Sequence, residues 1–471
     1  MATIQVLPVN LDLPKAEVLL QRPLLDSSVL LHVECTGSDR SISLLSRLIG
    51  CTGLYSIRVQ ATYQTTDACR RLTQLLKQVL LSCRNPNLLE LALDISPPRS
   101  GCVPPEPPSD YCGLGFTNDE RPPSLRSLEI IAYPWGREPN HESSINFHAI
   151  EHPAKGEEVD YWAEKFDWSK LCRLFDCSSD LAFRIVPKLT ALEEITFSRM
   201  HHPESIRSFL LTVPTMLLAI SIPTVSNVGV DSILRHKHTL RKLEIHHPDV
   251  LYKLQEHEIR QMRDSLLKLE ELTVDLGRSG ADWPCSLLDS LASFPSLRKL
   301  DVYFDLGRSD DIARPYLTAS TAMQLWKYMR DRSATLERVH LYSGCPSETG
   351  HGYPTDEVLW KADNTTSFIC EAVSEAQQEQ ELQVTCPKLD DRLNNELRAA
   401  CLSGAEKTIR LPDGHQVAFK VALEGPLPME EWVTRHRQDE AHALRTSRSV
   451  APKQRWTGLV RRVLSRFKPA E

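Results

Sequence analysis

Two histidine pairs are the residues whose types and spacing come nearest to metal chemistry. The stretches 201–204 (HHPE) and 246–249 (HHPD) combine imidazole and carboxylate groups, both of which bind zinc. Each follows a predicted strand, and one further repeat separates them. At a strand spacing of about 4.8 Å the pairs would lie roughly 10 Å apart, too far to share one ion. We therefore interpret them as polar loops after strands and expect no metal site; calorimetric titration with zinc would reveal one.

Signatures of catalysis are missing from the sequence. It contains no GxSxG, GxxxxGK[ST], GxGxxG or HExxH pattern. The SxxK match at 265–268 lies on a predicted amphipathic helix, and the GLG at 113–115 lies in a proline-rich stretch. We expect no catalytic residue and no cofactor, and an enzyme with an unrecognised site is kept only as an alternative.

A short apolar pattern, LxxLxL with Ile, Val or Phe allowed, recurs along the chain. From Leu171 to Leu297 successive copies begin 21 to 29 residues apart, the range of leucine-rich repeats. An earlier copy is expected at 29–33. The other copies begin at Leu54, Leu88, Leu125, Leu171, Leu192, Leu217, Leu240, Leu269, Leu297 and Leu336.

The period-two apolar positions predict a short strand in each copy, buried on one face. Apolar residues at helical spacing, such as Leu72, Leu76 and Val79, predict a helix between strands. Stacked strand–helix units bury a continuous core that one unit cannot bury alone. The predicted fold is therefore an irregular α/β leucine-rich-repeat solenoid, similar to ribonuclease inhibitor, with a parallel sheet on the concave face and helices outside.

The alternate strand positions are expected to point out of the concave face, where a protein partner would bind. Acidic residues modestly outnumber basic ones there, which favours a basic partner surface. The candidate partner-binding residues are Arg58, Glu129, Phe175, Glu244, Glu271, Asp275, Asp301, Tyr303, His340 and Tyr342.

Two insertions and two flanking regions complete the predicted organisation. Residues 1–23 form a lead-in, and 24–345 form the solenoid. Within it, 96–124 holds eight prolines and predicts an exposed loop, and the polar stretch 134–166 predicts a second loop leading to a strand at 168–171. Residues 346–424 are expected to cap the array, followed by a tail over 425–471.

Charge separates the tail from the rest of the chain. Residues 445–471 hold eight Lys or Arg residues and one Glu, a local charge of +7, whereas the remaining chain carries −14. Their spacing predicts a basic amphipathic helix, which could bind an anionic membrane, calmodulin or nucleic acid, or dock on the acidic body of the same chain. Flotation with anionic liposomes would test the membrane alternative. The candidate tail residues are Trp456, Arg461, Arg462, Arg466 and Phe467.

Composition narrows the class and the compartment. The 19 glycines have no period, which excludes a collagen-like chain. The sequence has no run of 18 apolar residues, so no membrane span is predicted. The 13 cysteines are scattered and form no CxxC, and the N-terminus has no signal-peptide pattern. We expect reduced thiols in a cytoplasmic or nuclear protein.

Several stretches resemble fungal F-box/leucine-rich-repeat proteins. They include PPSLRSLEI at 122–130, DWSKL at 167–171, the stretch from Leu317 to Gly344 and VTCPKL at 384–389, and the likeness spans about 24–400. The resemblance implies repeats that select a protein partner for a ubiquitin ligase. Residues 1–23 leave no room for a complete F-box, so we expect a ligase adaptor only if an F-box lies upstream.

Overall fold

The computed structural model describes most of the repeats and a C-terminal cap. The described residues are 3–7, 29–36, 38–51, 54–63, 65–82, 88–96, 112–117, 119–135, 158–177, 179–197, 202–247, 254–278, 282–344, 355–373, 381–403 and 416–434.

Fourteen of the described strands form one sheet in chain order, and the remaining two form a separate hairpin. The sheet strands are β1 (Thr3–Leu7), β2 (Val29–Thr36), β3 (Leu54–Thr62), β4 (Glu90–Ser96), β5 (Ser127–Ala132), β6 (Arg173–Phe175), β7 (Glu194–Thr196), β8 (Ala219–Ile222), β9 (Lys242–Ile245), β10 (Glu271–Leu276), β11 (Lys299–Phe304), β14 (Arg338–Ser343), β15 (Thr366–Val373) and β16 (Glu381–Thr385). The hairpin strands are β12 (Gly307–Arg308) and β13 (Asp311–Ile312).

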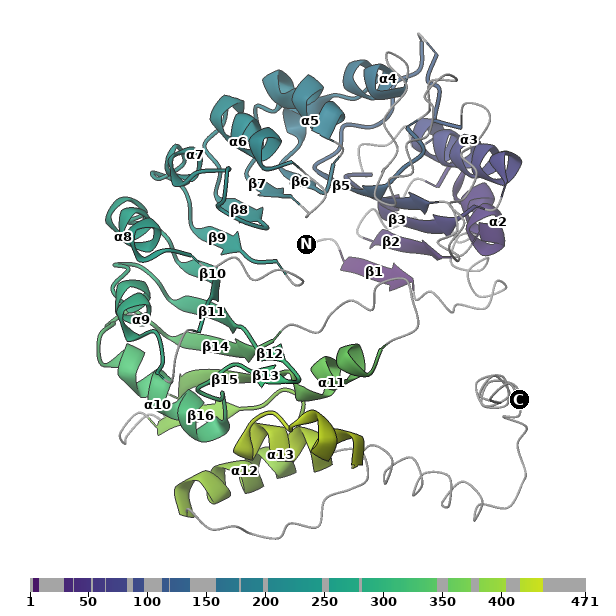
Figure 1. The fold of residues 1–471 in the computed structure, drawn as a ribbon. Helices are drawn as coiled ribbons and strands as arrows, with labels where there is room; N and C mark the ends of the chain where they lie inside the picture. The colour runs from purple at the N-terminus through teal and green to yellow at the C-terminus, as the bar shows by residue number, and fades with distance from the viewer. Residues whose placement is uncertain are drawn as a thin grey trace, which may run out of the picture.

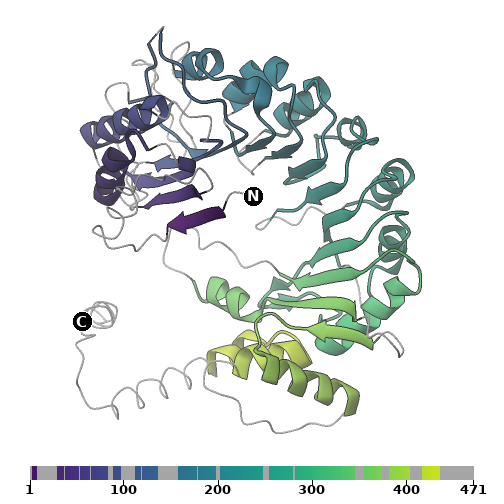
Figure 2. The same ribbon diagram turned by 180° about the vertical axis from the view of Figure 1, so that it is seen from behind.

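Every neighbouring pair from β1 to β11, and the pair β11–β14, is parallel. Figure 1 shows the strands along the inner side of an arc and the helices up to α10 (Ala319–Arg330) on its outer side. The same arrangement is seen from behind in Figure 2. The predicted α/β leucine-rich-repeat solenoid is thus confirmed. The helices are α2 (Ser38–Leu48), α3 (Thr66–Ser82), α4 (Glu158–Lys165), α5 (Ser179–Ile185), α6 (Pro203–Thr212), α7 (Val230–Leu234), α8 (Glu256–Ser265), α9 (Cys285–Ala292), α10 (Ala319–Arg330), α11 (Asp356–Asn364), α12 (Asp391–Ser403) and α13 (Gln416–Glu424), with 3-10 turns η1 (Trp168–Lys170) and η2 (Val186–Lys188).

The recurring leucine pattern explains this layering. In β11, Leu300, Val302 and Phe304 are fully buried under the helices, while the residues between them face the concave side. Each such side chain contributes about 2 kcal/mol on burial. The repeats are also uneven, as predicted, because β6 and β7 have three residues each whereas β10, β11 and β14 have six.

The prediction of an exposed loop over 96–124 is wrong for 112–116, whereas Thr117, Asp119 and Arg121 are exposed. Cys112, Leu114 and Phe116 are at most 3% exposed. The Leu114 amide donates to the Glu158 carboxylate at 2.8 Å. The proline-rich stretch therefore packs into the core at the point where it carries apolar side chains.

The predicted loop over 134–166 contains helix α4, which is a second correction. Trp162 of α4 is fully buried, and the buried Glu158 carboxylate accepts hydrogen bonds from Tyr133 at 2.6 Å and from the Trp162 indole at 2.8 Å. The expected strand at 168–171 is instead the turn η1, capped by the Asp167 side chain. The acidic surface of α4 hid its apolar face in the sequence.

The last strands reverse direction and end the solenoid. β15 pairs antiparallel with β14, and β16 pairs antiparallel with β15. A second small core joins α11 to 416–434, where Leu427 and Trp432 are each 2% exposed and the Leu427 amide donates to the buried Asn364 side chain at 2.6 Å. The boundary predicted at 425 is therefore wrong, since the packed unit reaches at least Trp432.

Candidate protein-binding face

The outward-facing residues of β9, β10, β11 and β14 align in three rows across the sheet. The first row is Lys242, Glu271, Lys299 and Arg338; the middle row is Glu244, Thr273, Asp301 and His340; the last row is His246, which directly follows β9, with Asp275, Tyr303 and Tyr342.

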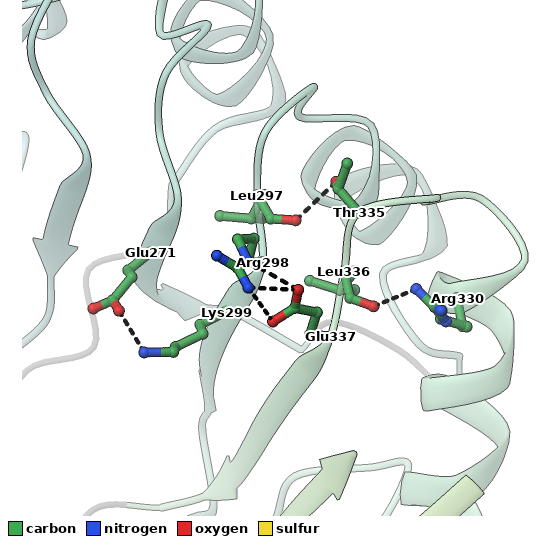
Figure 3. A network of polar contacts seen from close by, with 8 residues as sticks. All are labelled: Glu271, Leu297, Arg298, Lys299, Arg330, Thr335, Leu336 and Glu337. Carbon is green, nitrogen blue, oxygen red and sulfur yellow. Dashed lines mark hydrogen bonds and ion pairs between the residues drawn. The ribbon is translucent and has the colours of Figure 1, made fainter. Parts of the chain in front are cut away.

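The first row contains charges that largely compensate one another. Lys299 Nζ lies 2.6 Å from a Glu271 oxygen on one side of β11 (Figure 3). Just before the row, Arg298 binds both oxygens of Glu337 at 2.9 and 3.0 Å on the other side (Figure 3). Nearby, Thr335 donates to the Leu297 carbonyl at 2.9 Å (Figure 3). These pairs are exposed and contribute at most about 1 kcal/mol each, so they mainly neutralise this part of the face.

The last row is built around stacked rings. The His246 and Tyr303 ring centroids are 3.7 Å apart, and those of Tyr303 and Tyr342 are 4.0 Å apart. Tyr342 also lies against His340, with its hydroxyl 2.6 Å from His340 Nδ1. Because each ring is held by its neighbours, this surface loses little side-chain entropy when a partner binds.

Asp275 was predicted to contact a partner, and that prediction is wrong. Its side chain is 1% exposed, 2.6 Å from His246 Nδ1, and it accepts a hydrogen bond from the His247 amide at 3.0 Å. It lies between the strands of His246 and Tyr303, whose rings stack with each other. Burial raises the pKa of the Asp275 carboxyl, and His246 opposes that rise.

The middle row carries two carboxylates, on Glu244 and Asp301, that are not paired with any described side chain. Within the described residues, neither Glu244 nor Asp301 forms a hydrogen bond or an ion pair through its side chain. Burial raises the pKa of the Asp301 carboxyl; Glu244 and Glu271 add to the rise, while Arg338 and Lys242 oppose it. Burial and the nearby Arg338 lower the pKa of His340 to about 4, so His340 is neutral at pH 7 and supplies no counter-charge.

The earlier repeats have a different middle row. Arg58 on β3 reaches across Ala92 on β4 to Glu129 on β5, with 2.7 Å between Arg58 Nη2 and Glu129 Oε2. Arg173 similarly reaches across β5 to Glu90 at 2.5 Å. Arg58 and Glu129 therefore satisfy each other, and Phe175 is a partly exposed ring on β6.

The structure thus divides the predicted partner-binding residues into groups. Glu244, Glu271, Asp301, Tyr303, His340 and Tyr342 gather on β9–β14, whereas Arg58, Glu129 and Phe175 lie on β3–β6. The tail candidates Trp456, Arg461, Arg462, Arg466 and Phe467 lie outside the described residues.

The prediction from sequence missed His246 as part of the face. The signal was the seventh position of the repeats, which holds His246, Asp275, Tyr303 and Tyr342 in four successive copies. Among the described residues no group of three His, Cys, Asp or Glu side chains could hold a metal ion. The arrangement offers carboxylates and stacked rings, which suit binding.

Comparison with known proteins gives little further identification. No family model matches the chain, and no curated protein does. Among similar solved structures is the leucine-rich repeat-containing protein LegL7 from Legionella pneumophila, with 10% sequence identity and a TM-score of 0.32 over 66% of this chain and 83% of that one. So loose a superposition supports no argument; the fold rests on the strand pairing, and the F-box resemblance stays a prediction. Within the described ranges, no helix has the length and apolar character needed to cross a bilayer.

Proposed function

We propose that the chain is a non-enzymatic protein-interaction module that holds a protein partner on the concave face of β9–β14. The observation that carries this proposal is the middle row, where Glu244 and Asp301 have no partner in the described structure and lie beside a row of stacked rings.

The residue types support a partner with a basic surface. Aromatic side chains are enriched at the energetic centres of protein interfaces, because they bury a large area with few rotatable bonds. Carboxylates without internal counter-charges attract basic groups and steer their approach. Tyr303 and Tyr342 would supply contact area, and Glu244 and Asp301 would supply the charge that selects the partner.

The test is quantitative capture of binding proteins by the purified chain. Reversing charge at Glu244, Glu271 and Asp301 together, each to Lys, should reduce the amount of the bound partner by tenfold or more. Three weakened charge contacts of about 0.5 kcal/mol each account for that factor. Undiminished capture would exclude this face as the binding site.

A matched control places the same charge change on the outer helices. Glu164, Asp264 and Asp331 are exposed on or at the end of α4, α8 and α10. Changing these three residues to Lys should leave capture unchanged. Equal loss in both triple variants would mean that net charge, and not the concave face, controls binding.

A role as the substrate-binding arm of a ubiquitin ligase, in the cytoplasm or nucleus, is a separate proposal supported by the sequence resemblance alone. It requires an F-box upstream of the repeats to bind the ligase adaptor. Co-purification of the adaptor with the chain from cells would support it, and purification of the partner without any adaptor would exclude it.

A further inference from the structure

The middle row of β9–β11 has the geometry of a site for one cationic side chain. Glu244 and Asp301 lie on strands two apart, with Thr273 between them in register. Strands two apart are separated by about 10 Å, so a cation above Thr273 would lie about 5 Å from each carboxylate-bearing strand. Thr273 is small and neutral, which leaves space above it for an incoming group.

The same chain shows how a cation uses such a position. The Arg58 guanidinium reaches over the small Ala92 to bind Glu129, and the Arg173 guanidinium reaches over Ser127 to bind Glu90. In both cases an arginine spans two strands over a small residue. At Glu244–Thr273–Asp301 the small residue is present, but both flanking residues are acids.

The cations nearest to this position belong to the first row. Arg338 Nε lies 3.5 Å from Glu371 Oε1, and Lys299 pairs with Glu271. Burial is the main cause of the raised pKa of the Asp301 carboxyl; Arg338 and Lys242 oppose the rise, while Glu244 and Glu271 add to it. Because neither Glu244 nor Asp301 forms an ion pair among the described residues, a cation from outside the sheet would be attracted to them.

The chain carries a basic segment of its own after the cap. Residues 445–471 have a local charge of +7 and hold six arginines and two lysines. The described chain ends at 434, next to Trp432 and Val433, which pack in the cap with Trp360 of α11. The ten residues 435–444 can span up to about 35 Å when extended, which gives the basic segment a long reach from the cap.

We propose that residues 445–471 dock on the concave face of β9–β14, with an Arg or Lys side chain above Thr273 between Glu244 and Asp301. This inference rests on the proposed function, since it names an internal competitor for the same face. The basic segment would have to leave before a basic partner could bind, so the partner's affinity would depend on that displacement.

Zero-length crosslinking of the purified full chain tests the contact directly. A carbodiimide joins a lysine amine to a carboxylate only when the two touch, and the segment has two lysines, Lys453 and Lys468. We expect crosslinks within one chain from these lysines to Glu244, Glu271 or Asp301, and their loss at high salt. Crosslinks only to the outer helices, or only between copies in an isotopically mixed sample, would each overturn the proposal. An arginine in the site forms no crosslink, so in the absence of any crosslink the rates of trypsin cleavage decide.

Trypsin cleavage of the basic segment gives a second readout that does not depend on crosslinking chemistry. Neutralising Glu244→Gln and Asp301→Asn in the full chain should speed cleavage after Arg461 and Arg462 about fivefold, because two charge contacts of about 0.5 kcal/mol each are lost. The matched control is Glu90→Gln with Glu129→Gln, which neutralises carboxylates already paired within the sheet and should leave that rate unchanged. Equal rates in the two variants would contradict the proposed location.

Both experiments contain no partner. If they fail while capture still depends on Glu244, Glu271 and Asp301, the proposed function stands and only the docking of 445–471 is excluded.

Discussion

The concave face has an earlier half, β3–β6, and a later half, β9–β14, which differ in how their carboxylates are paired. On β3–β6 the carboxylates of Glu129 in the middle row and Glu90 in the first row each pair with an arginine two strands away, Arg58 and Arg173. On β9–β14 the first row is paired, but Glu244 and Asp301 in the middle row are not paired among the described residues. The carboxylates of the earlier half bind arginines of the same sheet, whereas Glu244 and Asp301 of the later half are available to a cation from a partner.

This difference indicates where a partner gains most by binding. A paired charge must lose its internal partner or be buried with it, which costs desolvation without a new attraction. An uncompensated carboxylate gains a counter-charge when a basic group arrives. The stacked rings of His246, Tyr303 and Tyr342 lie on the same half, so charge and contact area coincide there.

The largest expected effect is the pH dependence of stability that arises from His340 on β14, in the later half. The folded-state pKa of His340 is about 4 against 6.5 for a free imidazole, so the unfolded chain binds more protons between these values. The stability that His340 contributes is complete above pH 6.5 and is lost as pH falls towards 4, by about 3 kcal/mol in total.

Denaturant unfolding of wild type and His340→Gln between pH 7 and pH 4 would measure that loss. His340→Gln should remove the His340 part of the slope, leaving the contribution of the fully buried His236, whose pKa is also lowered to about 4. Identical slopes in the two proteins would show that His340 is not buried as described.

The ring stack gives the next largest effect. Tyr303→Ala removes the contacts with both His246 and Tyr342 and should lower the free energy of unfolding by about 2 kcal/mol. Tyr303→Phe keeps both ring contacts and should lower it by much less. Similar losses for Ala and Phe, measured by urea unfolding, would mean that the hydroxyl and not the stack is responsible.

Breaking the Arg58–Glu129 ion pair of the earlier half should have a smaller effect on stability. Arg58→Glu places two carboxylates on either side of Ala92, as Glu244 and Asp301 flank Thr273, and should cost about 1 kcal/mol because the pair is partly exposed. High salt should reduce this cost by screening the repulsion. A salt-independent loss in thermal unfolding would point to packing by the arginine stem instead.

Placing an internal counter-charge beside Asp301 in the later half should have the smallest effect on stability. Glu244→Arg creates an Arg–Thr–Asp row that copies Arg58–Ala92–Glu129 and should stabilise the fold by about 0.5 kcal/mol. The pKa of Asp301 should fall, because its counter-charge is now internal. An unchanged Asp301 titration, followed by NMR of its side-chain carboxyl, would show that the new arginine does not reach it.

Much of the fold could be predicted from the sequence because the LxxLxL copies report burial directly. Leu243, Leu272, Leu300 and Val339 occupy equivalent positions and are all buried, so the register of the rows follows once the copies are aligned. Apolar period-two spacing is a local property, and the parallel sheet follows from its repetition.

The rest depends on contacts between residues distant in sequence. Asp275 occupies an outward position but is buried, because the neighbouring His246 and Tyr303 rings stack with each other, which no spacing within β10 reveals. Helix α4 was missed because Glu158 and Trp162 find their partners near Leu114 and Tyr133, more than twenty residues away. The pairing of Arg58 with Glu129 likewise requires the order of the strands.

The most direct measurement of the central claim compares partner capture by two single variants of the middle row. Glu244→Arg fills the open position of the later half, whereas Glu129→Arg makes the same substitution in the satisfied half. With equal amounts of folded protein, the uncompensated-face account predicts strong loss of the partner for Glu244→Arg and near-normal capture for Glu129→Arg. Retention by Glu244→Arg, or equal loss in both variants, would contradict it.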